Sequence, residues 1–252
     1  MRDEQLWTDD LLESPHEAAD KAGRVRRMFN AIAPRYALVN TLFSAGRDAY
    51  WRRQAVSLAR VTSADDVLDV ACGTGDFARA FVAAGPRSVT GSDFAHEMLV
   101  RATQEPRPRR KGASCRPLWV EGDALRLPFR AGSFSIVSCA FGVRNFHDWD
   151  VGLAEMHRVL RPGGRAVILE FSRPGNAMVR ALYEVYAGRV MPVAAGWVSG
   201  DRSGAYRYLP RSVVSFVDSQ EFCSRLRRMG FADAVATPLT LGIVTVYVAA
   251  RT

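Results

Sequence analysis

A glycine loop flanked by acids is the part of this sequence best suited to chemistry. Gly73-x-Gly75-x-x-Ala78 follows an expected strand and opens an expected helix. Asp69 ends that strand, and Asp76 lies in the first turn of that helix. The spacing fits loops that bind a dinucleotide at a helix N-terminus. Spacing alone does not identify the ligand, because an ordinary glycine turn looks similar.

Charge separates the cofactor classes. A dinucleotide places its pyrophosphate at the helix N-terminus, where Asp69 and Asp76 would repel it. Two like charges about 4 Å apart at an effective dielectric of about 20 cost on the order of 4 kcal/mol. S-adenosylmethionine has no phosphate and carries an ammonium and a sulfonium, which the same carboxylates suit. The sequence has no G-K-[ST] motif for a nucleotide triphosphate, so we expect S-adenosylmethionine to be the cofactor.

Acids follow three successive expected strands. Asp93, after the second strand, is expected to accept hydrogen bonds from the ribose hydroxyls, and Asp123, after the third, from the adenine amino group. Helix capping is the structural alternative, and three acids at one sheet edge make it the weaker one. The expected cofactor-binding residues are Asp69, Ala71, Gly73, Thr74, Gly75, Asp76, Asp93, Phe94, Met98, Gly122, Asp123, Ala124 and Ala140.

Short apolar runs that alternate with helical patterns are expected to position these residues. Such alternation is typical of βαβ units and a mostly parallel sheet in an α/β fold. The expected strands are Asp66–Val70, Ser88–Ser92, Arg116–Val120, Ser135–Cys139, Arg165–Glu170, Asp233–Pro238 and Ile243–Ala249. The expected helices are Phe77–Ala84, Ala95–Thr103, Trp149–Leu160 and Ser219–Met229, and Gly163-Gly164 predicts a turn before the fifth strand.

Three segments lie outside this alternation within what we expect to be a single domain over residues 1–252. Residues 16–60 are expected to form an N-terminal helical extension, and residues 104–114 a basic, proline-broken loop. Residues 173–218 form an insertion whose length is typical of a substrate-covering element.

Composition sets broad limits. The chain has 252 residues, 48% of them hydrophobic, and a formal net charge of +8, which favours an anionic partner such as nucleic acid or a membrane surface. Four scattered cysteines, without C-x-x-C or Cys/His ligand spacing, predict reduced thiols and no metal site. No apolar run approaches the roughly 18 residues of a membrane-spanning helix, and the N-terminus lacks the pattern of a signal peptide. We therefore expect a soluble, cytoplasmic protein.

Several separate motifs resemble those of the C-methyltransferases of ubiquinone and menaquinone biosynthesis, over roughly Met28 to Val248. The motifs are Arg35-Tyr36-x-x-x-Asn40-x-x-x-Ser44-x-Gly46 with Trp51, Phe141-Gly142-Val143-Arg144-Asn145 with Asp148, Arg158-Val159-Leu160-Arg161-Pro162-Gly163-Gly164, Leu169-Glu170-Phe171-Ser172, Tyr206-Arg207-Tyr208-Leu209-Pro210 and Gly242-Ile243-Val244-Thr245. Departures are Ala37, Val39 and Leu241, where the family usually carries an acid, a Met, and an aromatic residue or glycine.

The resemblance implies a Rossmann-like class I methyltransferase fold. Such a fold has a seven-stranded, mostly parallel sheet with an antiparallel last strand, helices on both faces, an N-terminal helical extension and a helical insertion after strand 5. It also implies S-adenosylmethionine-dependent methylation of a ring carbon in a prenylated quinol. Arg144 would stabilise the phenolate with water relaying its proton, Asn145 would help to position the quinol oxygen, and Tyr36 would close the site.

Alternatives remain open at this point. Arg144 could instead form an ion pair with Asp148, and His147 could act as a general base. A lipid-soluble quinol implies contact with a membrane surface, for which Arg107–Lys111 and Val190–Val198 with Trp197 are the candidates. The acceptor is expected to be demethylmenaquinol, with a ubiquinone-pathway benzoquinol as the alternative.

Two other classes compete with a quinol methyltransferase. Nucleic-acid methyltransferases that act on base amino groups usually place Asn/Asp-Pro-Pro-Tyr after the fourth strand, where this chain has Ala140–Arg144, so no nucleic-acid partner is expected. Ala37 and Val39 motivate the second alternative, a cofactor-binding protein without catalysis. The oligomeric state, with a homodimer among the candidates, is not determined by the sequence.

Overall fold

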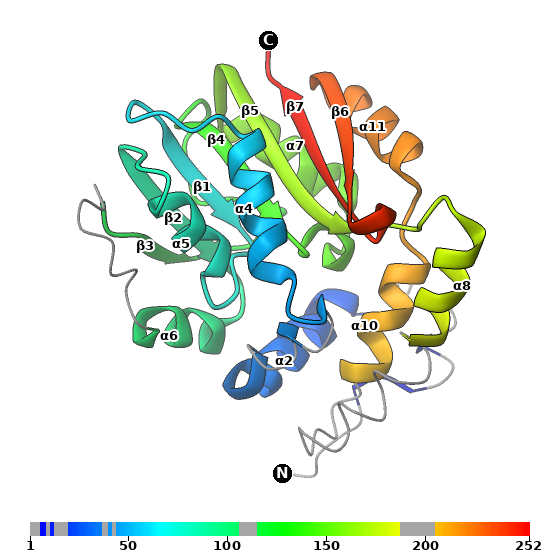
Figure 1. Cartoon of the computed structure of the whole chain (residues 1–252). Coiled ribbons are helices and arrows are strands. Elements are labelled where there is room, and N and C mark those ends of the chain that lie inside the picture. The colour runs from blue at the N-terminus through cyan, green and yellow to red at the C-terminus, as the bar shows by residue number, and fades with distance from the viewer. Residues whose placement is uncertain are drawn as a thin grey trace.

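The computed structural model describes residues 6–8, 11–12, 20–36, 40–41, 44–105, 115–186 and 205–252. Its centre is a seven-stranded sheet with the order β3-β2-β1-β4-β5-β7-β6 (Figure 1). The strands are β1 Asp66–Val70, β2 Ser88–Asp93, β3 Leu118–Glu121, β4 Phe134–Ala140, β5 Leu160–Phe171, β6 Ala232–Leu239 and β7 Val244–Ala250. Only β7 runs antiparallel to its neighbours β5 and β6, so the predicted sheet and its antiparallel last strand are confirmed.

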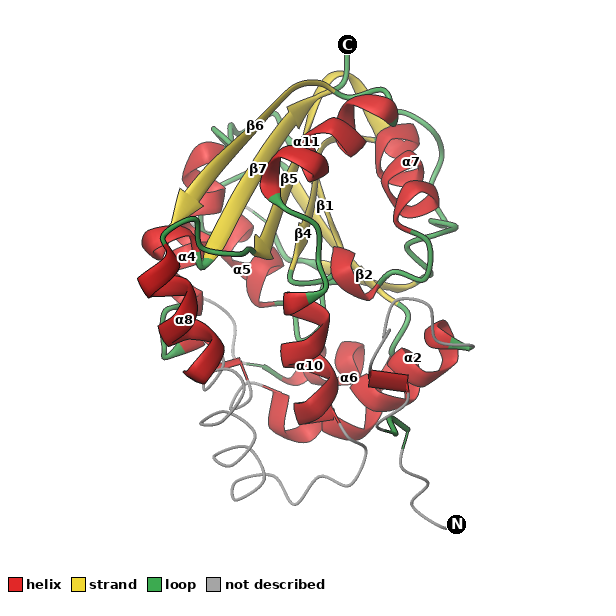
Figure 2. Cartoon of the chain, turned by 90° about the vertical axis from the view of Figure 1, so that its right-hand side faces the viewer, coloured by secondary structure: helices red, strands yellow, loops and turns green. Residues whose placement is uncertain are grey.

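Helices cover both faces of the sheet. On one face, α4 (Asp48–Leu58) and α5 (Asp76–Val82) pack against the strands, and on the other face lie α7 (Trp149–Val159) and α11 (Ser219–Arg228), as Figure 2 shows. α6 (His96–Gln104) connects β2 to β3. Strand β1 is buried along its whole length, as expected for a central strand of a parallel sheet covered on both faces.

The N-terminal extension and the insertion pack on each other below the carboxyl ends of the strands. The extension contains α2 (Lys21–Ile32) and the 3₁₀ turn η1 (Ala33–Arg35), and the insertion contains α8 (Ala177–Val185) and α10 (Ala205–Val214). Trp7 and Tyr208 stack with ring centroids 4.1 Å apart, and both belong to one buried cluster with Val25 and Met28. Residues near the N-terminus and helix α10 therefore share a core beside the sheet edge where ligands bind in such folds.

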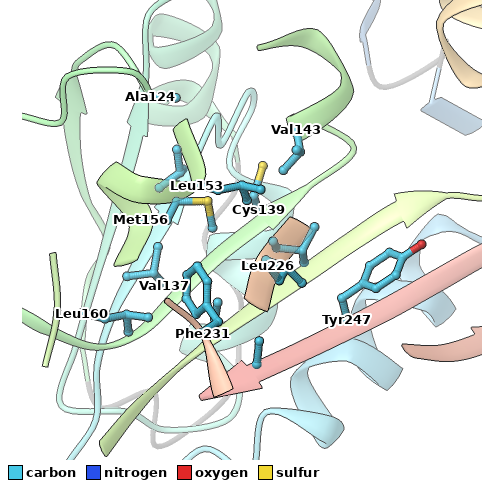
Figure 3. Packing of buried hydrophobic residues seen from close by; sticks show 14 of the residues in the cluster. Ala124, Val137, Cys139, Val143, Leu153, Met156, Leu160, Leu226, Phe231 and Tyr247 are labelled. Atoms are coloured by element: carbon cyan, nitrogen blue, oxygen red, sulfur yellow. The ribbon is translucent and has the colours of Figure 1, made fainter. Parts of the chain in front are cut away.

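A second buried cluster supports the loop that follows β4. Figure 3 shows Val143, from the 3₁₀ turn η2 (Val143–Asn145), beside Cys139 of β4 and above Leu153 of α7. Val143 is fully buried. Its burial anchors η2 to the core and thereby places the two polar residues that follow it.

The predicted boundaries differ from the structure in two informative places. β3 begins at Leu118 instead of Arg116, because it is an edge strand whose pairing with β2 starts at Thr90 opposite Leu118. A turn was predicted at Gly163-Gly164, and the structure includes these residues in β5 but as an irregularity: Phe134 pairs with Leu160 and Ile136 with Arg165, so residues 161–164 bulge out of the pairing with β4. Gly163 has φ +76°, and its N–H donates to the Arg251 carbonyl 2.7 Å away.

Candidate active site

The glycine loop after β1 is tightly wound and anchored to β2. Gly73 and Gly75 have φ values of +55° and +84°, in the left-handed region that glycine adopts without steric cost. A Cβ on Gly75 would lie 2.3 Å from the ring of Trp119, so only glycine fits there. The Gly73 N–H donates to Asp93 Oδ2 at 2.7 Å, which fixes the loop against the end of β2.

A cavity of about 170 Å³ opens beside this loop. Nine of the predicted cofactor residues line it, from the loops after four strands: Ala71, Gly73, Asp93, Phe94, Met98, Gly122, Asp123, Ala124 and Ala140. Tyr36 and Asn145, predicted to be catalytic, also line it. Residues predicted from four separate parts of the sequence are thus brought together around one space, which we call the cofactor cavity.

Asp93 and Asp123 differ in their surroundings. Asp93 is buried and accepts from two backbone N–H groups, of Gly73 and of Ala95 at 2.8 Å. Burial raises the pKa of Asp93 to about 6, although these N–H donors oppose the shift. Asp123 is exposed at the cavity wall and accepts from the Leu125 N–H at 2.9 Å. A carboxylate has about four acceptor positions, so both acids keep capacity for a ligand's hydroxyl or amino donors.

The remaining predicted cofactor residues lie outside the cofactor cavity. Asp69 and Asp76 line a small polar cavity, which also includes Tyr36, Arg52 and Ala71. Thr74 does not line these cavities; its Oγ1 donates to Asp76 Oδ2 at 3.1 Å. Gly75 serves to turn the loop, as described above.

The charges in the polar cavity differ from the expectation that Asp69 and Asp76 both face a cationic cofactor. Asp76 pairs with Arg79 at 2.8 Å. Burial opposes ionisation of Asp76, but Arg52 and Arg79 outweigh it and lower its pKa. Asp76 is therefore largely neutralised by arginines, and Asp69 is the carboxylate left to face a cation.

Asp69 is suited to a ligand's ammonium group. Its side chain is fully buried, Oδ1 accepts from Ser138 Oγ at 2.9 Å, and Oδ2 has no hydrogen-bond partner among the described residues. Burial raises the pKa of Asp69 to about 7. A buried acceptor without a donor is costly, and an ammonium would satisfy it. Arg52, whose Nε is likewise buried and unpartnered in the described structure, could take the carboxylate of the same amino-acid group.

Arg144 is held by a residue that the sequence interpretation did not consider. Its Nη1 lies 2.5 Å from Glu170 Oε1 and 2.6 Å from the Phe141 carbonyl oxygen. Burial raises the pKa of Glu170, and Arg144 opposes that rise. The alternative of an ion pair with Asp148 is wrong, because the Asp148 carboxylate caps α7 by accepting from the N–H groups of Asp150 and Val151. His147 is exposed at the edge of the cofactor cavity.

A second cavity lies on the other side of Tyr36 and Phe141. It is lined by Tyr36, Asn40, Ser44, Asp48, Phe141, Arg144, Phe171 and Leu209. Asn40 Nδ2 and Arg144 Nε are both buried and have no hydrogen-bond partner among the described residues. Two unsatisfied donors on one cavity wall are suited to an oxyanion, and we call this space the acceptor cavity.

Asn145 is fixed by a contact from the insertion. Its Nδ2 donates to the Phe141 carbonyl at 3.2 Å, and its Oδ1 accepts from the Tyr208 hydroxyl at 3.1 Å. Asn40 and Tyr208 belong to the motifs of the family resemblance, but the sequence indicates no role for either. Ala37 and Val39, which raised the question of lost activity, lie outside the described residues.

Lys21 is a further residue that sequence reasoning missed. This α2 lysine is buried, and its Nζ donates to the carbonyl oxygens of Phe146 at 2.5 Å and Arg144 at 3.3 Å. Burial lowers its pKa to about 8. The lysine thus connects the N-terminal extension to the backbone of η2, and no local sequence pattern announces a contact over that separation.

Replacing Lys21 by methionine is expected to lower kcat of the predicted methyl transfer about tenfold. Each buried carbonyl left without a donor costs about 1–3 kcal/mol, and η2 would shift. The dissociation constant of S-adenosylmethionine should change less than about twofold, as for the matched control Arg26→Met on an exposed position of the same helix. Steady-state kinetics and calorimetry check both values. An unchanged kcat in a folded Lys21→Met protein would exclude a positioning role.

Comparison with known proteins agrees with this geometry. A model of the ubiE/COQ5 methyltransferase family matches residues 17–251. The demethylmenaquinone methyltransferase of Deinococcus radiodurans is 45% identical over 230 residues, 91% of this chain and 93% of that protein. The ubiquinone/menaquinone biosynthesis C-methyltransferase UbiE of Geotalea uraniireducens is 41% identical over 236 residues, 91% of this chain and 97% of that protein.

Among solved structures, an S-adenosylmethionine-dependent methyltransferase from Thermotoga maritima resembles this chain with a TM-score of 0.61. Its sequence identity is 16%, over 89% of this chain and 100% of that one. At this identity the likeness concerns the fold alone, which is that of a class I methyltransferase.

Proposed function

Since this chain belongs to the ubiE/COQ5 methyltransferase family, we propose that it methylates a ring carbon of demethylmenaquinol. The chain is an S-adenosylmethionine-dependent C-methyltransferase of quinone biosynthesis. Relatives at 45% and 43% identity carry the name demethylmenaquinone methyltransferase, which supports a naphthoquinol over a benzoquinol as the acceptor.

One observation carries the assignment of the site: the cofactor cavity and the acceptor cavity share Tyr36 and Phe141 as walls. A methyl donor in the first cavity and a quinol in the second would meet at these two side chains. Tyr36 also packs over the loop, with its ring carbon Cε1 3.5 Å from where a Cβ of Gly73 would stand. It can therefore exclude water from the meeting point.

The acceptor carbon is a poor nucleophile until the neighbouring hydroxyl loses its proton. Arg144 Nε and Asn40 Nδ2 are the donors that would hold the phenolate oxygen and favour its ionisation. Arginine is a poor base at its usual pKa, so the proton leaves to water that Asn145 helps to position. Glu170 neutralises Arg144 and keeps it oriented.

Bound S-adenosylmethionine supplies an electrophilic methyl group. The ring carbon forms a bond to that carbon as the bond to sulfur breaks, with the electron pair going to sulfur. The ring carbon then loses its hydrogen as a proton, which restores the aromatic ring. Sulfonium and phenolate are neutralised together, so the aromatic walls at Phe141 and Phe171 favour the step by lowering the local dielectric.

The test is incubation with S-adenosylmethionine labelled in its methyl group and one of three acceptors: a short-tailed demethylmenaquinol, a benzoquinol analogue, or RNA. We expect label in the naphthoquinol, with kcat/KM at least about tenfold above the benzoquinol. Preference for the benzoquinol would mean that the acceptor is a benzoquinol of the ubiquinone pathway. Cofactor binding without transfer to any acceptor would support a protein that has lost catalysis.

The site of action that we propose is the inner face of the cytoplasmic membrane, where a prenylated quinol resides. Among the described residues, no helix is both long and apolar enough to span a bilayer, so the enzyme would work from the surface. The two contacts proposed from sequence, Arg107–Lys111 and Val190–Val198 with Trp197, lie outside the described residues.

A further inference from the structure

Helix α8 has apolar side chains on two opposite sides. Tyr183 and Tyr186 face inward and pack against the buried cluster that contains Tyr208 and Leu209. On the other side, Met178, Leu182 and Val185 are 73%, 67% and 51% exposed, and Ala177 and Ala181 are exposed beside them. A surface helix normally turns charged or polar residues to solvent. The helix lies at the edge of the molecule in both views (Figures 1 and 2).

A strained leucine extends this exposed surface. Leu241, in the 3₁₀ turn η4 (Thr240–Gly242), is 76% exposed and has a φ of +58°. The left-handed conformation costs a residue with a Cβ roughly 1–2 kcal/mol, and glycine avoids that cost. Trp51 Nε1 donates to Thr240 Oγ1 at 2.7 Å, so the turn is held from inside while Leu241 remains outside. Gly242 lies against Pro174 and Gly175, at the start of α8.

The outer apolar face is the name we give to Ala177, Met178, Ala181, Leu182, Val185 and Leu241. A residue shortly before α8 and two residues of α10 are exposed arginines: Arg173, Arg207 and Arg211. The sequences of α8 and α10 contain the three bases Arg180, Arg207 and Arg211 against one acid, Glu184. Exposed apolar side chains on an insertion with an excess of basic residues match an anionic bilayer surface, whose interior takes the former and whose headgroups attract the latter.

We propose that the outer apolar face docks on the surface of an anionic lipid bilayer and sets the acceptor cavity against the membrane. This inference rests on the proposed function, because a prenylated quinol resides in the lipid bilayer and the enzyme must reach it there. The inner side of α8 packs on the cluster that includes Leu209, and Leu209 lines the acceptor cavity. Docking through the outer side would therefore place α8 and Leu209 of α10 between the bilayer and the acceptor cavity.

The test is co-sedimentation of the full chain with vesicles of phosphatidylcholine, alone or with phosphatidylglycerol. The wild type is expected to bind the anionic vesicles, and Met178→Gln/Leu182→Gln to bind at least about tenfold more weakly. Burial of one leucine side chain is worth roughly ten- to hundredfold in an equilibrium constant. The matched control is Val151→Gln, at a 43% exposed position on α7, which should bind like the wild type.

For Leu241→Gly we expect the melting temperature and vesicle binding to respond differently. The substitution removes the strained side chain, so the melting temperature should stay equal or rise, while vesicle binding should fall. A fall in both would mean that Leu241 supports the fold and would remove it from the face. Salt distinguishes the two components: raising it from about 0.1 to 1 M shortens the screening length from about 10 to 3 Å, so the arginine contribution should be lost and the apolar one retained.

The membrane-docking proposal and the proposed function can be refuted independently of each other. Vesicle binding needs no quinol, and transfer to a short-tailed quinol in solution should be unchanged in the double variant. Binding lost in that variant supports the face even if the quinol proves not to be the acceptor. Equal vesicle binding by the wild type and the double variant would overturn the proposal. So would a wild-type dimer that dissociates in the double variant, since the face would then belong to a second copy of the chain.

Discussion

Arg144→Ala is expected to lower kcat for methyl transfer by about 10²–10³-fold, the usual effect of removing one donor that stabilises a developing oxyanion. The dissociation constant of S-adenosylmethionine should change less than about threefold. Arg144 lines the acceptor cavity and not the cofactor cavity, and Asp69 and Asp93 remain in place. Single-turnover kinetics and calorimetry measure the two quantities independently. Loss of cofactor binding in a folded variant would contradict the separation of the two sites.

Because Arg144 forms an ion pair with Glu170, its replacement also affects the stability of the fold. Glu170 is fully buried, and removing one partner of a buried ion pair costs about 3–5 kcal/mol. Arg144→Ala should therefore also lower the melting temperature. The double variant Arg144→Met/Glu170→Gln removes both charges and should recover most of the stability without recovering kcat. Activity that returns together with stability would mean that Arg144 acts only through the fold.

Asp93→Asn is expected to weaken S-adenosylmethionine binding about a hundredfold. The carboxylate accepts from the N–H of Gly73 and of Ala95, and an amide would direct its own N–H₂ at one of these donors. A buried mismatch of this kind costs about 1–3 kcal/mol, and a lost hydrogen bond to a charged group costs about 1.5–3 kcal/mol. Titration calorimetry at pH 7.5 measures the change, and an affinity within about threefold of the wild type would remove Asp93 from the site. Asp123→Asn, at the exposed acid on the same cavity, is the matched control with a smaller expected effect.

The pH dependence of binding follows from the same group. Burial raises the pKa of Asp93 to about 6, and cofactor hydroxyls donate to its ionised form. Below pH 6 the Asp93 carboxyl is protonated, and the cofactor must displace that proton to bind. The affinity for S-adenosylmethionine should therefore fall by up to about tenfold per pH unit as the pH decreases. Asp69, with a pKa raised to about 7, adds a fall in affinity that starts at higher pH. In Asp93→Asn the component near pH 6 should disappear and the component near pH 7 should remain.

The sequence predicted the sheet well because a short apolar run between two helical patterns is a local signal. All seven strands form, and the acids after β1, β2 and β3 lie at the same edge, since parallel strands bring their carboxyl ends together. The boundaries failed where a neighbour decides them, as at β3, whose pairing with β2 begins only at Leu118, opposite Thr90.

The partners of the catalytic side chains were not predictable in the same way. Asp148 is close to Arg144 in sequence, yet Glu170 pairs with it, because Ala140 lies opposite Leu169 in the sheet and Glu170 is the next residue of β5. A glutamate within the apolar run from Ala166 to Phe171 was the available signal, since a buried carboxylate requires a partner. Nothing comparable marks Lys21 or Tyr208, whose partners are set by how distant helices dock.

The shared core of Trp7 and Tyr208 imposes an order on the making of the enzyme. During synthesis the N-terminal extension leaves the ribosome well before α10, the helix that completes its core. Strands β1 to β5 precede α10 in the chain and can pair with one another before α10 appears, whereas the acceptor cavity, which Leu209 of α10 lines, needs α10 as well. A nascent chain would therefore acquire catalytic competence only after α10 has docked on the N-terminal extension.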